Sequence, residues 1–274
     1  GEGADEFFGG YNIFKEDMIR RFWARNPESV KRPKLLSALY PYIARNSRGN
    51  AFWHSFFGKG LADTDNPHYS HSIRWGNTSQ IKRFFKDGLL DEGYDAAAEL
   101  EEYLSPDIMK WHPLCRAQYL EASLFLPGYL LSSQGDRMLM ANSVEGRFPF
   151  LDHRVIEFAA TIPPEYKIRG LNEKYILKKI YGDILPESIS SRPKQPYRAP
   201  IARSFIDRET LAASMLDNDT IRRHGYFNSE NVELLLNKYR KNSGNSSGER
   251  DDMAIAGIVS MQLLHHHFIE RRSL

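Results

Sequence analysis

The chain has 274 residues, of which 41% are hydrophobic and 12% aromatic, and its 37 Lys and Arg residues nearly balance 35 Asp and Glu. This size and composition are typical of a globular protein with one large domain or two modest ones. The net charge of +2 argues against nucleic acid or an anionic membrane as a partner. The single cysteine, Cys115, excludes a disulfide framework and speaks against a zinc site, and no apolar run approaches the ~18–20 residues of a membrane span. We therefore expect a cytoplasmic protein.

Helical signals dominate the chain, and convincing strands are few, so the predicted fold class is mostly α. Helices are predicted over 95–104, 152–161, 172–181, 229–241 and 251–270. Asp152 and Asn172 are the expected N-caps of the second and third. The expected buried stripes are Val155, Ile156, Phe158 and Ala159 in the second helix, Val232, Leu235, Leu236 and Tyr239 in the fourth, and Ala254, Ile258, Met261, Leu264 and Phe268 in the fifth. We interpret His265, His266 and His267 as polar residues of a helix end, since consecutive histidines on a helix point in different directions.

The first ten residues, Gly-Glu-Gly-Ala-Asp-Glu-Phe-Phe-Gly-Gly, carry the densest chemistry. Glu2, Asp5 and Glu6 follow a spacing of i, i+3 and i+4, which would bring three carboxylates to one face of a helical turn. Their repulsion can be relieved by a cation, by raised pKa values or by the positive end of a helix dipole. Hard oxygens on a short turn suit Mg²⁺ shared with phosphate oxygens. An acidic helix start without a ligand is the alternative interpretation.

A second candidate is Ser-Ser-Arg-Pro-Lys-Gln-Pro-Tyr-Arg-Ala-Pro at 190–200, whose prolines favour an extended chain. Arg192, Lys194 and Arg198 would then share one side and could bind a carboxylate or phosphate. Lys174, on the predicted basic helix that begins at Asn172, could reach the same site. A solvated basic loop, a proline-rich docking peptide and a solvated helix face are the alternatives.

The segment 136–154 alternates acidic and basic residues within an apolar frame. For all of these residues except Asp136, the favoured interpretation is a buried network of ion pairs that fixes packing.

Together, in this order, the segments resemble the asparagine synthetase family. The opening Gly-Glu-Gly-Ala-Asp-Glu-Phe-Phe-Gly-Gly-Tyr is similar to the family's synthetase signature. The stretch Ser-Val-Glu-Gly-Arg-Phe-Pro-Phe-Leu-Asp-His-Arg at 143–154 is similar to its next block, and Glu-Lys-Tyr-Ile-Leu at 173–177 with Arg-Pro-Lys at 192–194 continues it. The resemblance is tight over 1–11 and 131–200 and loose over 25–115.

The resemblance implies an ATP-dependent ligase that uses Mg²⁺. In this family a carboxylate, aspartate in asparagine synthetase, attacks the α-phosphorus of ATP, and ammonia from glutamine then displaces AMP to leave an amide. Asp5 would be the Mg²⁺ ligand, Glu2 would face the adenylate or the incoming amine, and Lys194 would stabilise the phosphate charge. The backbone of Gly1 would approach the nucleotide. Asp136 matches a position at which the related β-lactam synthetases carry an acid that assists a base.

The family's pyrophosphate loop, Ser-Gly-Gly-x-Asp-Ser, and its N-terminal glutaminase domain with a leading cysteine are not found in these 274 residues. We therefore expect the helical C-terminal portion of an α/β adenine-nucleotide α-hydrolase-like (ATP-pyrophosphatase) synthetase domain, with few or no strands and with a divergent helical insertion over 25–115. Such a chain is expected to be inactive in isolation and to need the missing glutaminase part as partner, and a second copy in a homodimer is a further expected partner. A β-lactam synthetase-like cyclase, another carboxylate amidotransferase, and a helical module that docks an acidic protein are the alternative functions.

Overall fold

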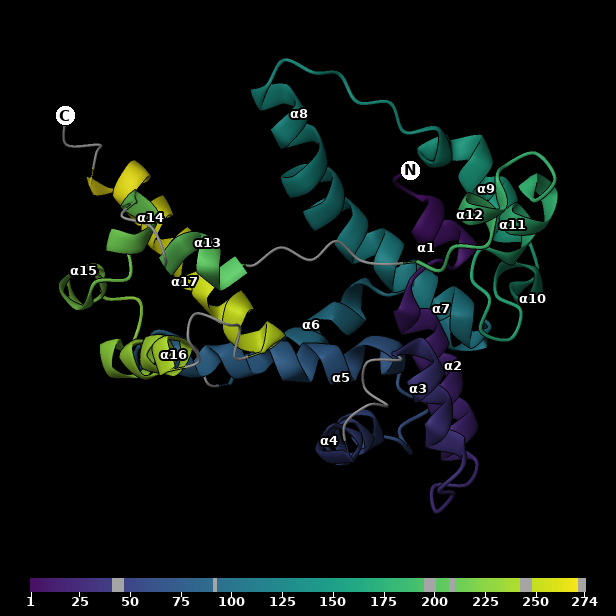
Figure 1. Cartoon of the computed structure of the whole chain (residues 1–274), viewed down its shortest axis with the longest axis horizontal. Helices are drawn as coiled ribbons and strands as arrows, with labels where there is room; N and C mark the ends of the chain where they lie inside the picture. Colours follow the sequence, from purple (N-terminus) through teal and green to yellow (C-terminus); the bar gives the residue numbers. More distant parts are fainter. Residues whose placement is uncertain (41–46, 91–92, 195–200, 207–209, 242–247, 271–274) are drawn as a thin grey trace. The chain divides into compact units, whose positions relative to one another are not determined.

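The computed structural model is helical throughout its described parts, which are residues 1–40, 47–90, 93–194, 201–206, 210–241 and 248–270 (Figure 1). Within these parts β-pairing is confined to two isolated bridges, Phe85 with Phe227 and Arg169 with Asn172. The predicted mostly α fold class is confirmed. In the same residues, no helix combines the length and the apolar character that crossing a membrane requires.

The chain divides into two compact units. Unit 1 consists of Gly1–Ile73 and Tyr103–Gln195, and unit 2 of Arg74–Glu102 and Pro196–Leu274. The α-helices that lie in unit 1 are α1 (Ala4–Phe8), α2 (Asn12–Ala24), α3 (Leu36–Leu39), α4 (Ser47–Gly58), α7 (Pro113–Leu120), α8 (Arg137–Ala141), α9 (His153–Thr161), α10 (Pro164–Lys167), α11 (Tyr175–Tyr181) and α12 (Glu187–Ser190). A π-helical stretch, Glu121–Asp136, joins α7 to α8, and short 3-10 turns cover Arg32–Leu35, Ile108–Lys110 and Pro149–Leu151.

Helix α2 is the central element of unit 1, because it contributes to two apolar clusters. Ile13 and Phe14 pack with Leu114 and Ala117 of α7, while residues one to two turns later pack with the α3–α5 region. The members of the second cluster are Ile19, Trp23, Leu36, Phe57 and Ile73. A third cluster joins Phe8 of α1 to Ala159 of α9 and to Ile162. The charged residues of α2 are therefore also enclosed, and each needs a partner.

In unit 2, the packing of α16 (Ser229–Lys241) against α17 (Glu249–Phe268) supplies the core. The unit also holds α6 (Ala96–Tyr103), α13 (Ile201–Ile206), α14 (Leu211–Ser214), α15 (Asn218–His224) and a 3-10 turn, Ser79–Phe84, and α5 (Tyr69–Thr78) runs from unit 1 into it. The four predicted core residues of α16 are all buried: Val232, Leu235, Leu236 and Tyr239.

The buried face of helix α17 differs from the predicted one. Ala254 and Ile258 are buried as expected, but Leu264 and Phe268 are exposed at 57% and 60%. After Asp251 and Asp252, the buried residues of the helix are Ala254, Ile255, Ile258, Val259 and Gln262. The buried face is therefore rotated by about one residue from the predicted stripe, because Ile255 and Val259 meet the unit 2 core in place of the last two predicted positions.

Two further helices, α9 and α11, agree with their predictions only in part. Helix α9 begins as expected, with Asp152 accepting a hydrogen bond from the Arg154 amide at 2.9 Å, but Phe158 is 64% exposed and Ala159 supplies the buried contact. Helix α11 begins at Tyr175 and not after Asn172, so the predicted cap is wrong. The reason is a tight turn: Arg169 and Asn172 exchange both backbone hydrogen bonds, which leaves Asn172 outside the helix.

The prediction of a buried ion-pair network over 136–154 is wrong. Glu145 pairs with Arg147 at 2.9 Å, but both side chains are at least 70% exposed. Arg154 binds Asp152 at 2.7 Å from the solvent side. Exposed pairs of this kind contribute about 0–1 kcal/mol, so this segment does not owe its packing to them.

Candidate functional site

The opening glycine-rich segment forms a short helix, α1, between two left-handed glycines. Gly3 precedes it with φ 91° and Gly9 ends it with φ 73°. Space as well as conformation requires Gly3, since a Cβ there would lie 2.5 Å from the Leu151 side chain. Glycine adopts such left-handed conformations without the penalty that a Cβ brings. The two glycines thus fix where α1 begins and ends, and with it the direction of the Asp5 side chain.

Asp5 lies between two lysines that are distant in the sequence. Nζ of Lys174 is 2.9 Å from Oδ1 of Asp5, and Nζ of Lys194 donates a hydrogen bond to Oδ2 at 2.9 Å. The two lysines remain partly accessible, at 24% for Lys174 and 31% for Lys194, whereas Asp5 is 13% exposed and its Oδ1 is covered. The structure therefore brings together three residues that the sequence nominated, and the three carry a net charge of +1.

Gly10 borders this cluster directly. A Cβ built at Gly10 would lie 2.0 Å from Oδ1 of Asp5 and 2.3 Å from Cε of Lys174. Any side chain at this position would overlap both groups. The absence of a side chain at Gly10 is therefore what permits the pair to close.

The buried side chain of Glu173 supports this cluster through hydrogen bonds. Its carboxylate accepts hydrogen bonds from Nζ of Lys15 at 2.8 Å, from Nζ of Lys178 at 3.0 Å and from the backbone amide of Lys194 at 3.0 Å. Burial alone would raise the pKa of Glu173, but the hydrogen bonds from Lys15, a backbone amide and Lys178 outweigh it and lower the pKa to about 2. One buried carboxylate thus ties α2, α11 and the segment that carries Lys194 to each other.

Lys174 has a backbone conformation that is unusual for its residue type. Its φ of 51° and ψ of 35° are left-handed. For a residue with a Cβ this conformation costs ~1–2 kcal/mol. Strain of this kind persists where surrounding contacts hold it, and it gathers at functional sites. Here it turns Lys174 toward Asp5 while its neighbour Glu173 points into the protein.

The remaining acidic residue of α1, Glu6, binds Tyr11 and not the two lysines. It is buried and accepts a hydrogen bond from the Tyr11 hydroxyl at 2.7 Å. Burial is the main cause that raises the pKa of Glu6, and the charges of Asp5 and Glu2 add to it. Nζ of Lys194 lies 5.7 Å from the centre of the Tyr11 ring, within the range of a cation–π contact. The expectation that Glu2, Asp5 and Glu6 share one face is wrong, because Glu2 precedes the helix and Glu6 turns to Tyr11.

The aspartate–lysine cluster consists of Asp5, Lys174 and Lys194. The other residues that the sequence analysis selected for the site lie outside it. Glu2 is half-buried on the turn before α1, and Gly1 is exposed. Asp136 is an exposed residue at the start of α8, and among the described residues its side chain makes no ion pair or hydrogen bond with the cluster. Of the three cations expected on one side of 190–200, Arg192 is exposed and Arg198 lies outside the described residues.

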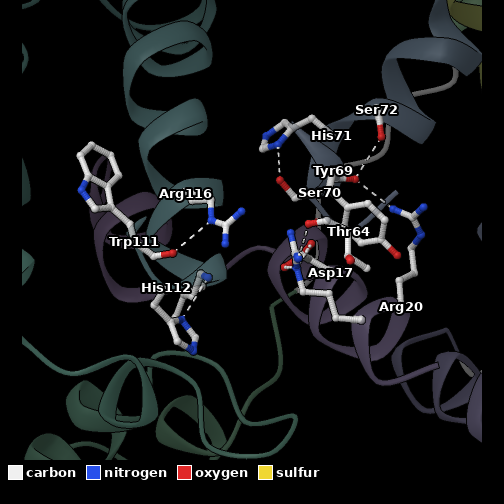
Figure 2. A network of polar contacts seen from close by, with 12 residues as sticks. Asp17, Arg20, Thr64, Tyr69, Ser70, His71, Ser72, Trp111, His112 and Arg116 are labelled. Atoms are coloured by element: carbon white, nitrogen blue, oxygen red, sulfur yellow. Dashed lines mark hydrogen bonds and ion pairs between the residues drawn. The ribbon is translucent and has the colours of Figure 1, made fainter. Parts of the chain in front are cut away.

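A second polar network lies further along α2, and Figure 2 labels Asp17, Arg20, Thr64 and Tyr69 among its residues. Arg21 binds both oxygens of Asp17 at 3.0 Å and the Thr64 carbonyl at 2.8 Å. The guanidinium of Arg20 donates to the Tyr69 carbonyl at 2.9 Å and lies 4.1 Å from the centre of the Tyr69 ring. Burial raises the pKa of Asp17, and the pair with Arg21 offsets part of that effect. This network fixes the 57–71 segment to α2 and so supports the helix that presents Lys15.

Comparison with known proteins places these observations in a family. The model of the family described as asparagine synthase matches residues 1–266. The chain belongs to the asparagine synthase family. The structure is accordingly a helical part of an asparagine synthase domain. No solved structure matches the chain.

Individual relatives of the asparagine synthase family agree with this assignment. Asparagine synthetase [glutamine-hydrolyzing] 1 of Bacillus subtilis is 30% identical over 212 residues, which cover 76% of this chain and 31% of that protein. Amidase chyE of Penicillium rubens is 29% identical over 222 residues, 73% of this chain and 31% of the amidase. Asparagine synthetase [glutamine-hydrolyzing] 3 of Bacillus subtilis is 32% identical over 199 residues, 72% of this chain and 25% of that protein. The chain thus spans less than a third of the length of these relatives.

Sequence reasoning omitted Glu173, Gly10 and Lys15 from the candidate site. Glu173 and Lys174 are neighbours in one motif, but only the lysine was selected, because its positive charge suits a phosphate. The signal that could have found Glu173 is an acidic residue next to a candidate cation in an otherwise basic segment. No local signal points to Lys15, which is 158 residues from its partner.

Proposed function

We propose that this chain supplies part of the synthetase site of an ATP-dependent amide ligase. The observation that carries the proposal is the convergence of Lys174 and Lys194 on Asp5, each at 2.9 Å. Two ammonium groups on one carboxylate form a site whose cations can turn to an incoming anion. A triphosphate offers several oxygens to them, and fixed cations stabilise the negative charge that spreads over phosphate oxygens during phosphoryl-type transfer.

The reaction that such a site serves has two steps. A carboxylate oxygen of the acceptor attacks the α-phosphorus of ATP, and pyrophosphate leaves with the electrons of the broken P–O bond. Ammonia then attacks the acyl carbon of the adenylate, loses a proton and displaces AMP, which leaves an amide. Lys194 would stabilise charge in both steps, since both place negative charge on the α-phosphate, and Glu173 would hold the Lys194 backbone in position through its 3.0 Å hydrogen bond. Glu2 and the backbone of Gly1, on the turn before α1, would face the adenylate.

The donor set at Asp5 suits Mg²⁺ that arrives with ATP. Magnesium is commonly bound by one or two carboxylates together with substrate phosphates, and Asp5 offers one carboxylate on a fixed turn. When bound, Mg²⁺ would neutralise phosphate charge. Phosphate binding would then release Asp5 for the ion, because the two lysines would pair with phosphate oxygens and no longer with the Asp5 carboxylate.

Aspartate is the acceptor that we propose, and ammonia derived from glutamine is the proposed amine. Two relatives that match the chain are asparagine synthetases described as glutamine-hydrolyzing, and these support the assignment. A relative described as an amidase supports the wider class of carboxylate amidotransferases. A comparison of aspartate with other carboxylates in the exchange assay below distinguishes the two.

The test is aspartate-dependent exchange of pyrophosphate into ATP by the protein whose synthetase domain contains these residues. Lys194→Ala is expected to lower the exchange rate by ~100-fold or more, since it removes a cation aimed at the reacting phosphate. The matched control is Lys179→Ala, an exposed lysine of α11 outside the cluster. Equal rates for Lys194→Ala and the unmodified protein would refute the proposal. Exchange that depends on a carboxylate other than aspartate would retain the ligase and replace the acceptor.

The isolated 274 residues are expected to bind Mg-ATP weakly and to catalyse no exchange. The cluster contributes cations and one carboxylate, while the pyrophosphate loop of the family is not found in the chain. Calorimetric titration of the chain with Mg-ATP measures this directly. Micromolar affinity would show that the described cluster is sufficient for nucleotide binding.

A further inference from the structure

We propose that His224, His265 and Glu270 in unit 2 form a binding site for a divalent transition-metal ion such as Zn²⁺. One donor atom from each of the three side chains lies within 4.8 Å of the other two. His224 is the last residue of α15, His265 belongs to the last turn of α17, and Glu270 follows that helix. The two imidazole rings contact each other, with centres 4.0 Å apart and planes tilted by 30°, so a small rotation of the half-buried His265 side chain would direct both toward one ion. All three residues belong to unit 2, whereas Asp5, Lys174 and Lys194 belong to unit 1.

The orientation of His224 is set by a buried amide. Nδ1 of His224 lies 3.0 Å from Oε1 of Gln262, and Nε2 of the same amide donates to the Met215 carbonyl at 3.4 Å. Because that contact assigns the amide oxygen to the histidine, Nδ1 of His224 carries the proton and donates it. Nε2 of His224 is left facing Oε1 of Glu270 at 3.1 Å. Metal-binding histidines usually donate their other ring N–H to such an oxygen, which fixes both tautomer and ring direction.

The distance between these two atoms suits an ion. Zinc binds imidazole nitrogen and carboxylate oxygen at ~2.0–2.2 Å, which places neighbouring donors of a tetrahedral site about 3.3 Å apart. The observed 3.1 Å between Nε2 of His224 and Oε1 of Glu270 is close to that value. An ion between them would bridge the two atoms.

His265 is also held in place and available as a ligand. Its Nδ1 is 2.8 Å from the Tyr226 hydroxyl, and Tyr226 follows α15 by two residues. When Nδ1 of His265 donates to this hydroxyl, Nε2 is the ring nitrogen left to bind a metal.

Of His224 and Glu270, Glu270 is the ligand that solvent reaches, since its side chain is 30% exposed. Its Oε1 also accepts from Nε of Arg223 at 3.1 Å, and its Oε2 pairs with Nδ1 of His266 at 2.8 Å. Arg223 is 59% exposed, so it can turn to solvent when an ion approaches. His266 can remain on the second oxygen and orient the carboxylate.

The chemistry of the three donors selects the class of ion. Two imidazoles and one carboxylate suit Zn²⁺ and the similar ions Co²⁺, Ni²⁺ and Fe²⁺, whereas Mg²⁺ and Ca²⁺ prefer oxygen ligands alone. Three protein ligands leave a fourth position for water. Such an ion would cross-link the end of α15 to the end of α17, on which the core of unit 2 depends.

The test is calorimetric titration of the 274-residue chain, without an added histidine tag, with ZnCl₂. We expect saturable binding that weakens at least ~10-fold in His265→Ala and in Glu270→Gln, and about 10-fold in Tyr226→Phe, which loses only an orienting hydroxyl. The matched control is His267→Ala, an exposed histidine of the same helix turn, which should leave the affinity within about twofold.

Two results would overturn the assignment. One is the absence of saturable binding to the unmodified chain. The other is an equal loss of affinity in His265→Ala and His267→Ala, which would mean that Zn²⁺ binds a run of surface histidines. Circular dichroism verifies the fold of each variant. If His265→Ala loses helix content, Glu270→Gln decides, since it removes one charge and keeps the size of the side chain.

Discussion

Substitution of Glu173 by glutamine tests whether one buried carboxylate holds the aspartate–lysine cluster together. Glu173 is 3% exposed and faces the ammonium groups of Lys15 and Lys178. Its pKa falls from the ordinary 4.5 to about 2. At about 1.4 kcal/mol for each pH unit, this corresponds to roughly 3 kcal/mol of folding free energy. Breaking a buried ion pair by removing one partner costs ~3–5 kcal/mol, because the remaining charge is left without compensation.

The expected result for Glu173→Gln is therefore a loss of about 3 kcal/mol in the free energy of unfolding at pH 7. Urea titration followed by tryptophan fluorescence measures it, since Trp23, Trp53 and Trp111 report on unit 1. Glu187→Gln removes an exposed carboxylate from α12 and is the matched control, with an expected change within about 0.5 kcal/mol.

The dependence of this difference on pH gives the sharper test. A carboxyl whose pKa is lower in the folded state stabilises the protein above its unfolded pKa and loses that contribution as the pH falls toward its folded pKa. The advantage of the unmodified chain over Glu173→Gln should hence be full above pH 5 and decline between about pH 4.5 and 2. A difference below 1 kcal/mol at pH 7, or one that stays constant down to pH 3, would refute the reasoning.

Three further predictions concern the site and the core. Gly10→Ala should reduce pyrophosphate exchange at least ~10-fold and destabilise unit 1 by ~1–3 kcal/mol, because its Cβ would overlap Asp5 and Lys174; exchange kinetics and urea titration measure the two effects. Lys174→Gly should be about 1 kcal/mol more stable than Lys174→Ala in urea titration, since only glycine adopts φ 51° freely, while both variants lose exchange activity; equal stabilities would contradict the strain. Leu235→Ala should cost unit 2 ~2–5 kcal/mol, measured by thermal unfolding followed by circular dichroism, and a loss below 1 kcal/mol would contradict its place in the core.

Local signals in the sequence predicted the helices whose caps and periodicity are set by their own residues. The ends of α16 and its buried positions follow from the periodicity of Val232, Leu235 and Tyr239, and the start of α9 follows from the cap at Asp152. The start of α11 could not be predicted in this way, because the left-handed Lys174 is imposed by contacts outside the segment. Periodicity also gave the wrong face for the end of α17, since exposed apolar residues and buried ones look alike in sequence.

The candidate site was predictable only in part, for a related reason. Asp5 and Lys194 were selected by charge type and by resemblance to a family, and the structure places them together. Glu173 and Lys15 could not be paired from sequence, because nothing local connects a lysine of α2 to an acid 158 residues later. The same holds for His224 and Glu270, which are joined by the packing of α15 on α17.

The neighbours Glu173 and Lys174 explain how a strained backbone can persist in unit 1. The left-handed Lys174 costs ~1–2 kcal/mol by itself, and nothing in its own side chain compensates for it apart from the partly exposed pair with Asp5. Glu173 offsets this cost, because its bonds to Lys15 and Lys178 fix the preceding residue and contribute roughly 3 kcal/mol. Since the same carboxylate also binds the Lys194 amide, it sets the positions of both lysines that meet at Asp5. Stability and the proposed chemistry therefore depend on one residue that touches no phosphate, and a loss of exchange activity in Glu173→Gln would follow from displaced lysines.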